Sequence, residues 1–108
     1  MSGDYLKGLF EAAQRIQVEM ARVKAELANK TVSAETGGGL VTCIANGKGD
    51  LVSLNVDPSL LGAENQQMLQ DLVVGAVNLA LERARQLAQE EVAKATGGLQ
   101  FPPGMLGA

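Results

Sequence analysis

Apolar residues recur at steps of three and four from the start of the chain, and this spacing predicts an amphipathic helix over about residues 4–28. The apolar seam consists of Leu6, Leu9, Ala13, Ile16, Met20, Val23 and Leu27. Outside the seam, charged residues of alternating sign follow one another at spacings of four, as expected of a solvated helix face. A helix of this length spans roughly 36 Å at 1.5 Å per residue.

Three short segments follow whose patterns predict β-strands: residues 31–36, 40–45 and 51–56. Glycine-rich turns at 37–39 and 46–50 separate them, so both connections are predicted to be hairpins and the sheet an antiparallel meander. The middle segment is apolar on both faces apart from Thr42, which favours the central position.

The two outer segments alternate between apolar and polar residues, which predicts strands with one buried face. In the first, Val32 and Ala34 share that face. In the third, we expect Val52, Leu54 and Val56 to point inward and the intervening polar residues to point outward.

A second helix is predicted from about Glu64 for about 30 residues, ending at Thr96-Gly97-Gly98. Its apolar stripe comprises Leu69, Leu72, Val73, Ala76, Val77, Ala80, Ala84, Leu87, Ala88, Val92 and Ala95. The small residues in this stripe would let another helix approach closely. We therefore expect one domain over residues 1–98, followed by an extended and partly mobile tail over 99–108.

Both helices are longer than the sheet, because a six-residue strand spans only about 20 Å. Chain connectivity places residues 1–15 and 83–96 beyond the sheet, where we expect them to run antiparallel as a projecting arm. The unburied seam then predicts a tight homodimer. The side chains expected in this core and dimer seam are Leu9, Ile16, Met20, Val23, Leu27, Leu72 and Leu87.

Composition argues against several functions. The chain has no histidine and a single cysteine, Cys43, so neither a cysteine–histidine pair nor a metal site is expected, and an enzyme with a cofactor or small-molecule substrate is disfavoured. The run Gly37–Gly39 lacks the lysine of a phosphate-binding loop and fits a hairpin turn. No apolar run approaches the ~18 residues of a membrane span, and a cytoplasmic protein is expected.

A group of short motifs is similar to a family signature: Gly38-Gly39-Leu40-Val41, Asn46-Gly47, Val56-Asp57-Pro58-Ser59-Leu60-Leu61, and Pro102-Pro103-Gly104 in the tail. Together they resemble the YbaB/EbfC family of bacterial nucleoid-associated proteins, over essentially the whole chain. The resemblance implies an α+β protomer of order α-β-β-β-α and a tweezer-like homodimer. It also implies binding of double-stranded DNA with low sequence specificity, location in the nucleoid, and an influence on gene expression.

The charge pattern alone does not lead to DNA, because the net charge is −3 and acidic residues accompany the basic ones on the predicted arm. With the resemblance, the residues expected to contact phosphates are Arg15, Arg22, Lys24, Arg83, Arg85 and Lys94. Arg83 and Arg85 point about 200° apart, so one of them is expected to serve folding or a local ion pair. The alternative is a non-enzymatic interaction module whose helical arms clamp a protein partner.

Overall fold

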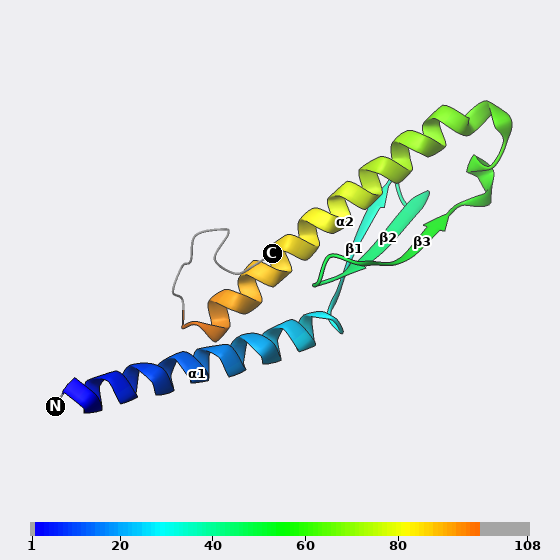
Figure 1. Cartoon of the computed structure of the whole chain (residues 1–108). Helices are drawn as coiled ribbons and strands as arrows, with labels where there is room; N and C mark the ends of the chain where they lie inside the picture. Colours follow the sequence, from blue (N-terminus) through cyan, green and yellow to red (C-terminus); the bar gives the residue numbers. More distant parts are fainter. Residues whose placement is uncertain (1, 98–108) are drawn as a thin grey trace.

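The computed structural model describes residues 2–97, and its elements follow the order α-β-β-β-α (Figure 1). Helix α1 covers Ser2–Leu27 and helix α2 covers Gln66–Ala95. Strands β1 (Thr31–Thr36), β2 (Val41–Asn46) and β3 (Leu51–Val56) lie between them. The α+β architecture predicted from the sequence is confirmed. The tail predicted for residues 99–108 lies outside the described residues.

The three strands form one antiparallel sheet in the order β1-β2-β3, as the two hairpin turns predict. After β3, Pro58–Leu60 and Ala63–Asn65 form two short 3-10 turns that lead into α2, which therefore begins two residues later than predicted. The Asp57 carboxylate accepts a hydrogen bond from the Ser59 N–H at 2.9 Å, and this bond lowers the pKa of Asp57. The capped turn ends β3 cleanly at the predicted place.

Helix α2 packs on the sheet through alanines. Ala76, Ala80 and Ala84 are fully buried against strand residues that are themselves small, and the buried cluster includes Ala34, Val41, Cys43 and Ala45. The prediction that the small stripe admits another helix is therefore wrong: it admits the sheet. Small side chains on both surfaces allow the helix and strand backbones to approach closely, and an aliphatic core forms without any large aromatic residue.

Strand β3 contains a bulge that the alternating pattern does not reveal. Leu51 pairs with Ala45 and Ser53 pairs with Ile44, so Val52 is the extra residue. Val52 is 57% exposed, and the prediction that it points inward is wrong. Leu54 lies opposite the buried Cys43 and shares its face, as predicted, yet it remains 44% exposed because α2 covers β1 and β2 and barely contacts β3.

Against the other described elements, α1 packs only through its C-terminal half. Val23 and Leu27 are buried, whereas Leu9 and Ile16 on the same seam are about half exposed. The end of α2 reaches only the middle of α1, so residues 2–11 extend beyond it (Figure 1). We call this segment the α1 tip. The predicted pairing of residues 1–15 with 83–96 is therefore wrong in its register, because the first half of α2 is used to cover the sheet.

The start of the β2–β3 turn anchors α1. The Gly47 N–H donates to the carbonyl oxygens of Leu27 and Lys30, both at 2.9 Å. A Cβ atom at Gly47 would lie 2.6 Å from the Leu27 Cδ2 and 3.0 Å from the Leu27 carbonyl oxygen. Glycine is therefore required here by the close approach of the helix end to the turn.

Gly47→Ala is expected to lower the free energy of unfolding by about 1–3 kcal/mol, because the added methyl group overlaps the end of α1. Urea denaturation measures this change. The matched control is Gly8→Ala, since nothing lies within 4 Å of that position on α1. The control should instead raise stability by about 0.5–1 kcal/mol, the usual difference between these residues in a helix. Equal effects of the two substitutions would contradict the anchoring contact.

Candidate nucleic-acid interface

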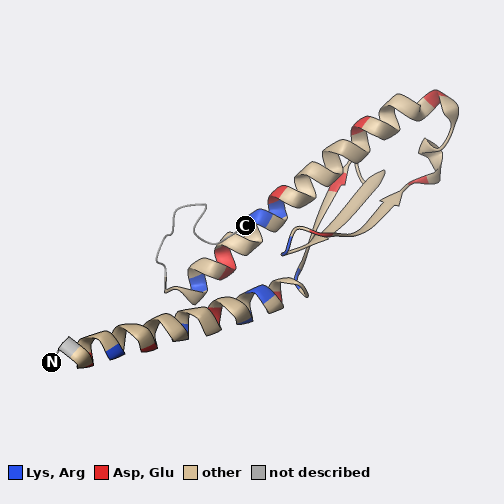
Figure 2. Cartoon of the chain, viewed as in Figure 1, with Lys and Arg blue, Asp and Glu red and all other residues tan. Residues whose placement is uncertain are grey.

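Charged residues are confined almost entirely to the helices and turns. Within the three strands, only Glu35 is charged, whereas lysine and arginine are interspersed with acidic residues along α1 and along the second half of α2 (Figure 2). Any electrostatic contact with an anion must therefore come mainly from α1 and α2. Whether a given lysine or arginine is available for such a contact depends on the acidic residues beside it.

On α1, Arg22 is held by two carboxylates of its own helix. Its guanidinium lies 2.7 Å from a Glu19 oxygen and 2.6 Å from a Glu26 oxygen. These hydrogen bonds raise the pKa of Arg22 and lower that of Glu19. A phosphate that contacts Arg22 must compete with both carboxylates, so this predicted site residue is electrostatically compensated.

The other predicted cations of α1 are uncompensated. Within residues 2–97, neither Arg15 nor Lys24 forms an ion pair. They are nine residues apart and so project on opposite sides of α1. Arg15 and Arg22 share one side at about 10.5 Å along the axis, whereas Lys24 lies apart from both. The structure thus does not bring the three predicted residues of α1 onto one face.

On α2, both arginines have local partners. Arg83 donates to the Ser33 carbonyl oxygen at 2.5 Å and so joins the helix to the free edge of β1. Arg85 forms an ion pair with Glu82 at 2.8 Å. The two residues do not share a partner, as their angular separation predicts. Arg83 lies over the sheet instead of on the predicted arm.

An ion pair links the end of α2 to the segment between α1 and β1. The Lys30 Nζ lies 2.9 Å from one Glu91 oxygen, and the Lys94 Nζ lies 3.6 Å from the other. The hydrogen bond from Lys30 holds the pKa of Glu91 below its ordinary value. Lys94 is thus the third predicted cation with a carboxylate partner, although it remains largely exposed.

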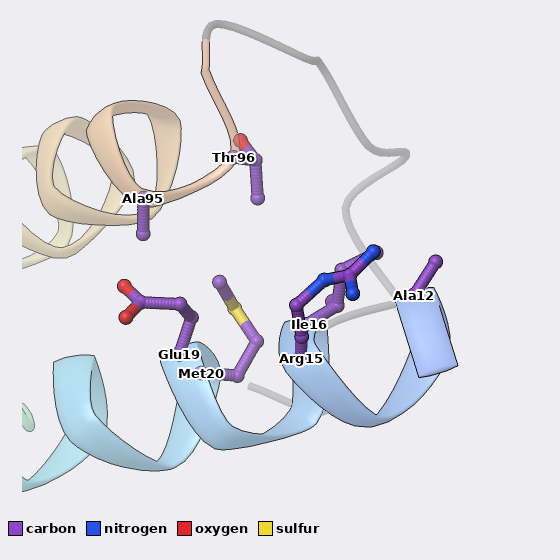
Figure 3. Close-up of a pocket in the computed structure, with 7 residues that line it drawn as sticks. All are labelled: Ala12, Arg15, Ile16, Glu19, Met20, Ala95 and Thr96. Carbon is purple, nitrogen blue, oxygen red and sulfur yellow. The ribbon is translucent and has the colours of Figure 1, made fainter. Parts of the chain in front are cut away.

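The two helices meet at a small open groove of about 310 Å³. Met20 points from α1 toward Ala95 of α2, and Ile16 and Arg15 lie next to it on the side of the α1 tip (Figure 3). Among residues 2–97, the groove is lined by Ala12, Arg15, Ile16, Glu19, Met20, Ala95 and Thr96. The groove floor is apolar, and Arg15 and Glu19 provide its charges.

Three cations were not among the predicted site residues: Lys30, which pairs with Glu91, and Lys7 and Lys48. Lys7 on the α1 tip and Lys48 in the β2–β3 turn form no ion pair within residues 2–97. Lys7 precedes Arg15 by eight residues, which places the two about 80° apart around α1 and about 12 Å apart along it. Their helical spacing was a usable signal, but the acidic neighbours of the arginines could be identified as partners only from the structure.

Other kinds of site find no support in the described part of the chain. In residues 2–97, no group of three or more histidine, cysteine or acidic residues could hold a metal ion. Cys43 lies in the core, where burial raises the pKa of its thiol. No helix among the described residues is long and apolar enough to cross a membrane.

Comparison with known proteins places this geometry in a family. A nucleoid-associated protein of Pelotomaculum thermopropionicum is 37% identical over 102 residues, which cover 94% of this chain and 97% of that protein. Another from Acetivibrio thermocellus is 41% identical over 103 residues, with coverage of 95% and 91%. The crystal structure of uncharacterized protein HP0035 from Helicobacter pylori has 25% sequence identity and a TM-score of 0.72, covering 90% of this chain and 99% of that chain. With a family match over residues 2–99, the chain belongs to the YbaB/EbfC DNA-binding family.

Proposed function

We propose that this protein binds double-stranded DNA, mainly through backbone phosphates and with low sequence specificity, and that it acts in the nucleoid on DNA organisation and gene expression. The observation that carries the proposal is the match to a DNA-binding family over residues 2–99, nearly the whole chain. The names of the relatives, nucleoid-associated proteins, support the proposed location.

The charge environments rank the proposed contacts. Arg15 is the strongest candidate among the six, because it is exposed and pairs with no carboxylate of residues 2–97, and Lys7 extends the same side of α1. Lys24 is equally unpaired but projects elsewhere. Arg22, Arg85 and Lys94 would have to exchange a carboxylate for a phosphate, and Arg83 would have to leave the Ser33 carbonyl. Few uncompensated cations favour weak, salt-sensitive binding.

We also propose a homodimer, and the uncovered part of the sheet supplies its surface. Leu51 and Leu54 lie on the helix-facing side of β3 but are about half exposed. Leu72 and Arg83 of α2 contact β1. Val74 follows Leu72 by two residues and Leu81 precedes Arg83 by two, a separation of about 200° around the helix. Val74 and Leu81 therefore face the side of β3. We propose that a second copy covers these four apolar side chains with its own.

DNA binding is tested by fluorescence anisotropy with two duplexes of unrelated sequence, each titrated at about 50 mM and about 200 mM salt. Backbone binding predicts similar affinities for both duplexes and a steep loss at the higher salt, because each neutralised phosphate releases counterions. No binding at the lower salt concentration would refute the proposal.

Arg15→Glu is expected to weaken binding to both duplexes alike and to flatten the slope of log affinity against log salt by about one to two units for two symmetric copies. Glu11→Lys, one turn away on the same side of α1, should strengthen binding and steepen the slope. Circular dichroism should show an unchanged fold in both variants, since both side chains are exposed. Equal affinities of wild type and the two variants would remove α1 from the interface.

A protein-interaction module remains the second candidate, favoured by the net charge of −3 and the exposed apolar residues of α1. An apolar partner would bind with little salt dependence, because burial of apolar surface is not screened. The absence of DNA binding in the anisotropy series, together with salt-insensitive binding to a protein in a separate titration, would favour this alternative.

A further inference from the structure

An asparagine–glycine pair lies at the start of the β2–β3 turn, where the end of α1 is anchored. Asn46 is the last residue of β2 and the only asparagine in the chain that a glycine follows. In such a pair, the backbone nitrogen of the glycine can attack the side-chain amide of the asparagine, because glycine has no side chain to shield that nitrogen. Asparagine is therefore a thermolabile residue, and its lifetime depends on the local structure.

The nucleophile of this reaction is restrained by α1. The Gly47 N–H donates to the carbonyl oxygens of Leu27 and Lys30, each at 2.9 Å, and Gly47 is buried. The nitrogen must lose its proton before it attacks, and two acceptors together with burial keep that proton in place. Attack therefore requires the end of α1 to leave the turn.

The electrophile is restrained by the turn itself. The Asn46 Oδ1 accepts hydrogen bonds from the Lys48 N–H at 3.0 Å and the Asp50 N–H at 3.1 Å. Both bonds are exposed, and exposed turn bonds open at low free energy. The contact between Gly47 and the end of α1 is consequently the stronger of the two restraints.

We propose that Asn46 is a site of spontaneous deamidation, protected while α1 is attached to the turn and reactive when α1 detaches. The Gly47 nitrogen forms a bond to the Asn46 Cγ, the Cγ–Nδ2 bond breaks, and the leaving ammonia takes up the proton of the Gly47 nitrogen. One water molecule then opens the succinimide ring at either carbonyl, which yields aspartate or isoaspartate at position 46. The reaction needs no oxidant or reductant.

The two products differ in their effect on α1. Aspartate preserves the main chain and an oxygen that accepts from the N–H groups of Lys48 and Asp50. Isoaspartate routes the main chain through the former side chain, which adds one carbon, or about 1.5 Å, before Gly47. The Gly47 N–H then no longer meets both carbonyl oxygens of the α1 end. Formation of isoaspartate thus makes a transient detachment of α1 permanent.

Val23→Ala tests the protection, because it loosens α1 without changing the turn. Val23 is 2% exposed, and the matched control is Val18→Ala on the same helix, where the side chain is 67% exposed. Peptide mapping by mass spectrometry measures deamidation of Asn46 in each full-length protein at mildly alkaline pH. The Val23→Ala variant should deamidate about tenfold faster than the wild type, the equivalent of losing two buried methyl groups, and the control at the wild-type rate.

Hydrogen exchange measured by NMR identifies the opening that exposes the site. In Val23→Ala, the Gly47 amide should exchange faster by the same factor as the deamidation, whereas amides of β2 keep their protection. Equal deamidation rates in the three proteins would overturn the proposal. So would an equal loss of protection in β2, because global unfolding would then control the reaction. A native wild-type rate equal to that of the chain unfolded in urea would overturn it as well.

The effect of the product is measured on the isoaspartate form, separated by ion-exchange chromatography. Amides of residues 20–27 should lose protection by about tenfold or more in this form, as expected for two lost hydrogen bonds. Asn46→Asp is the matched control, because it carries the same charge on an unaltered main chain, and it should keep the protection. Equal protection in the two proteins would contradict the detachment of α1. None of these readouts depends on DNA binding.

Discussion

Light scattering of a Leu54→Asp variant at micromolar concentration is expected to give the mass of a single 11.2 kDa chain, against about twice that mass for the wild type. Leu54 faces the same side as the buried Cys43 but is left half uncovered by α2. In the proposed dimer, each copy would bury this side chain. Losing two such contacts at about 1.5 kcal/mol or more each should raise the dissociation constant by at least about a hundredfold.

Asn55→Asp is the matched control, because it adds the same charge to the adjacent residue on the opposite face of β3. The control should keep the wild-type mass. A dimeric Leu54→Asp variant would place the interface elsewhere, and a monomeric wild type would refute the dimer itself. Circular dichroism of both variants distinguishes loss of association from loss of fold.

Ala80→Leu is expected to lower the free energy of unfolding by about 3 kcal/mol, at the upper end of the range for overpacking. Ala80 is 0% exposed and faces a sheet surface whose own buried residues are small. A leucine can fit only if α2 moves away from β1 and β2, which would open the whole buried cluster. Thermal and urea denaturation measure the loss.

The same substitution at an exposed position of the same helix, Ala93→Leu, provides the comparison. It should change stability by no more than about 0.5 kcal/mol, as surface substitutions usually do. Similar stabilities for the two variants would mean that α2 does not rest on the sheet through its alanines.

The periodicity of apolar residues predicted both helices and the two outer strands, and a short apolar run between two glycine-rich turns predicted β2. Periodicity could not reveal the bulge at Val52, because Leu51 and Val52 are both apolar and the sequence does not show which of them shares a face with Leu54. The position of α1 relative to α2 was also missed. Strand length alone does not say how much of a helix the sheet will occupy.

The small residues of α2 correctly indicated where the helix packs closely, but they suggested another helix as the partner instead of the sheet. The stripe of Ala76, Ala80 and Ala84 indicated close packing, but helix and sheet partners impose the same requirement on one helix face. The answer lay in the strands, where Ala34, Cys43 and Ala45 present a matching small surface. For the candidate interface, the sequence supplied the cations, but whether each one has a carboxylate partner depends on side-chain geometry that spacing alone leaves open.

Because α1 is attached near one end, a small rotation at the attachment moves its other end a long way. Its 26 residues span about 39 Å; it is held near one end, at Leu27 and Val23, and residues 2–11 at the other end extend beyond α2. A rotation of about 10° at that attachment displaces the far end by about 7 Å, by the geometry of a rod of this length. Two such levers in a dimer could adapt to objects of different width with little rearrangement of the sheet core. Stiffness at the Gly47 contact would then set the range of widths.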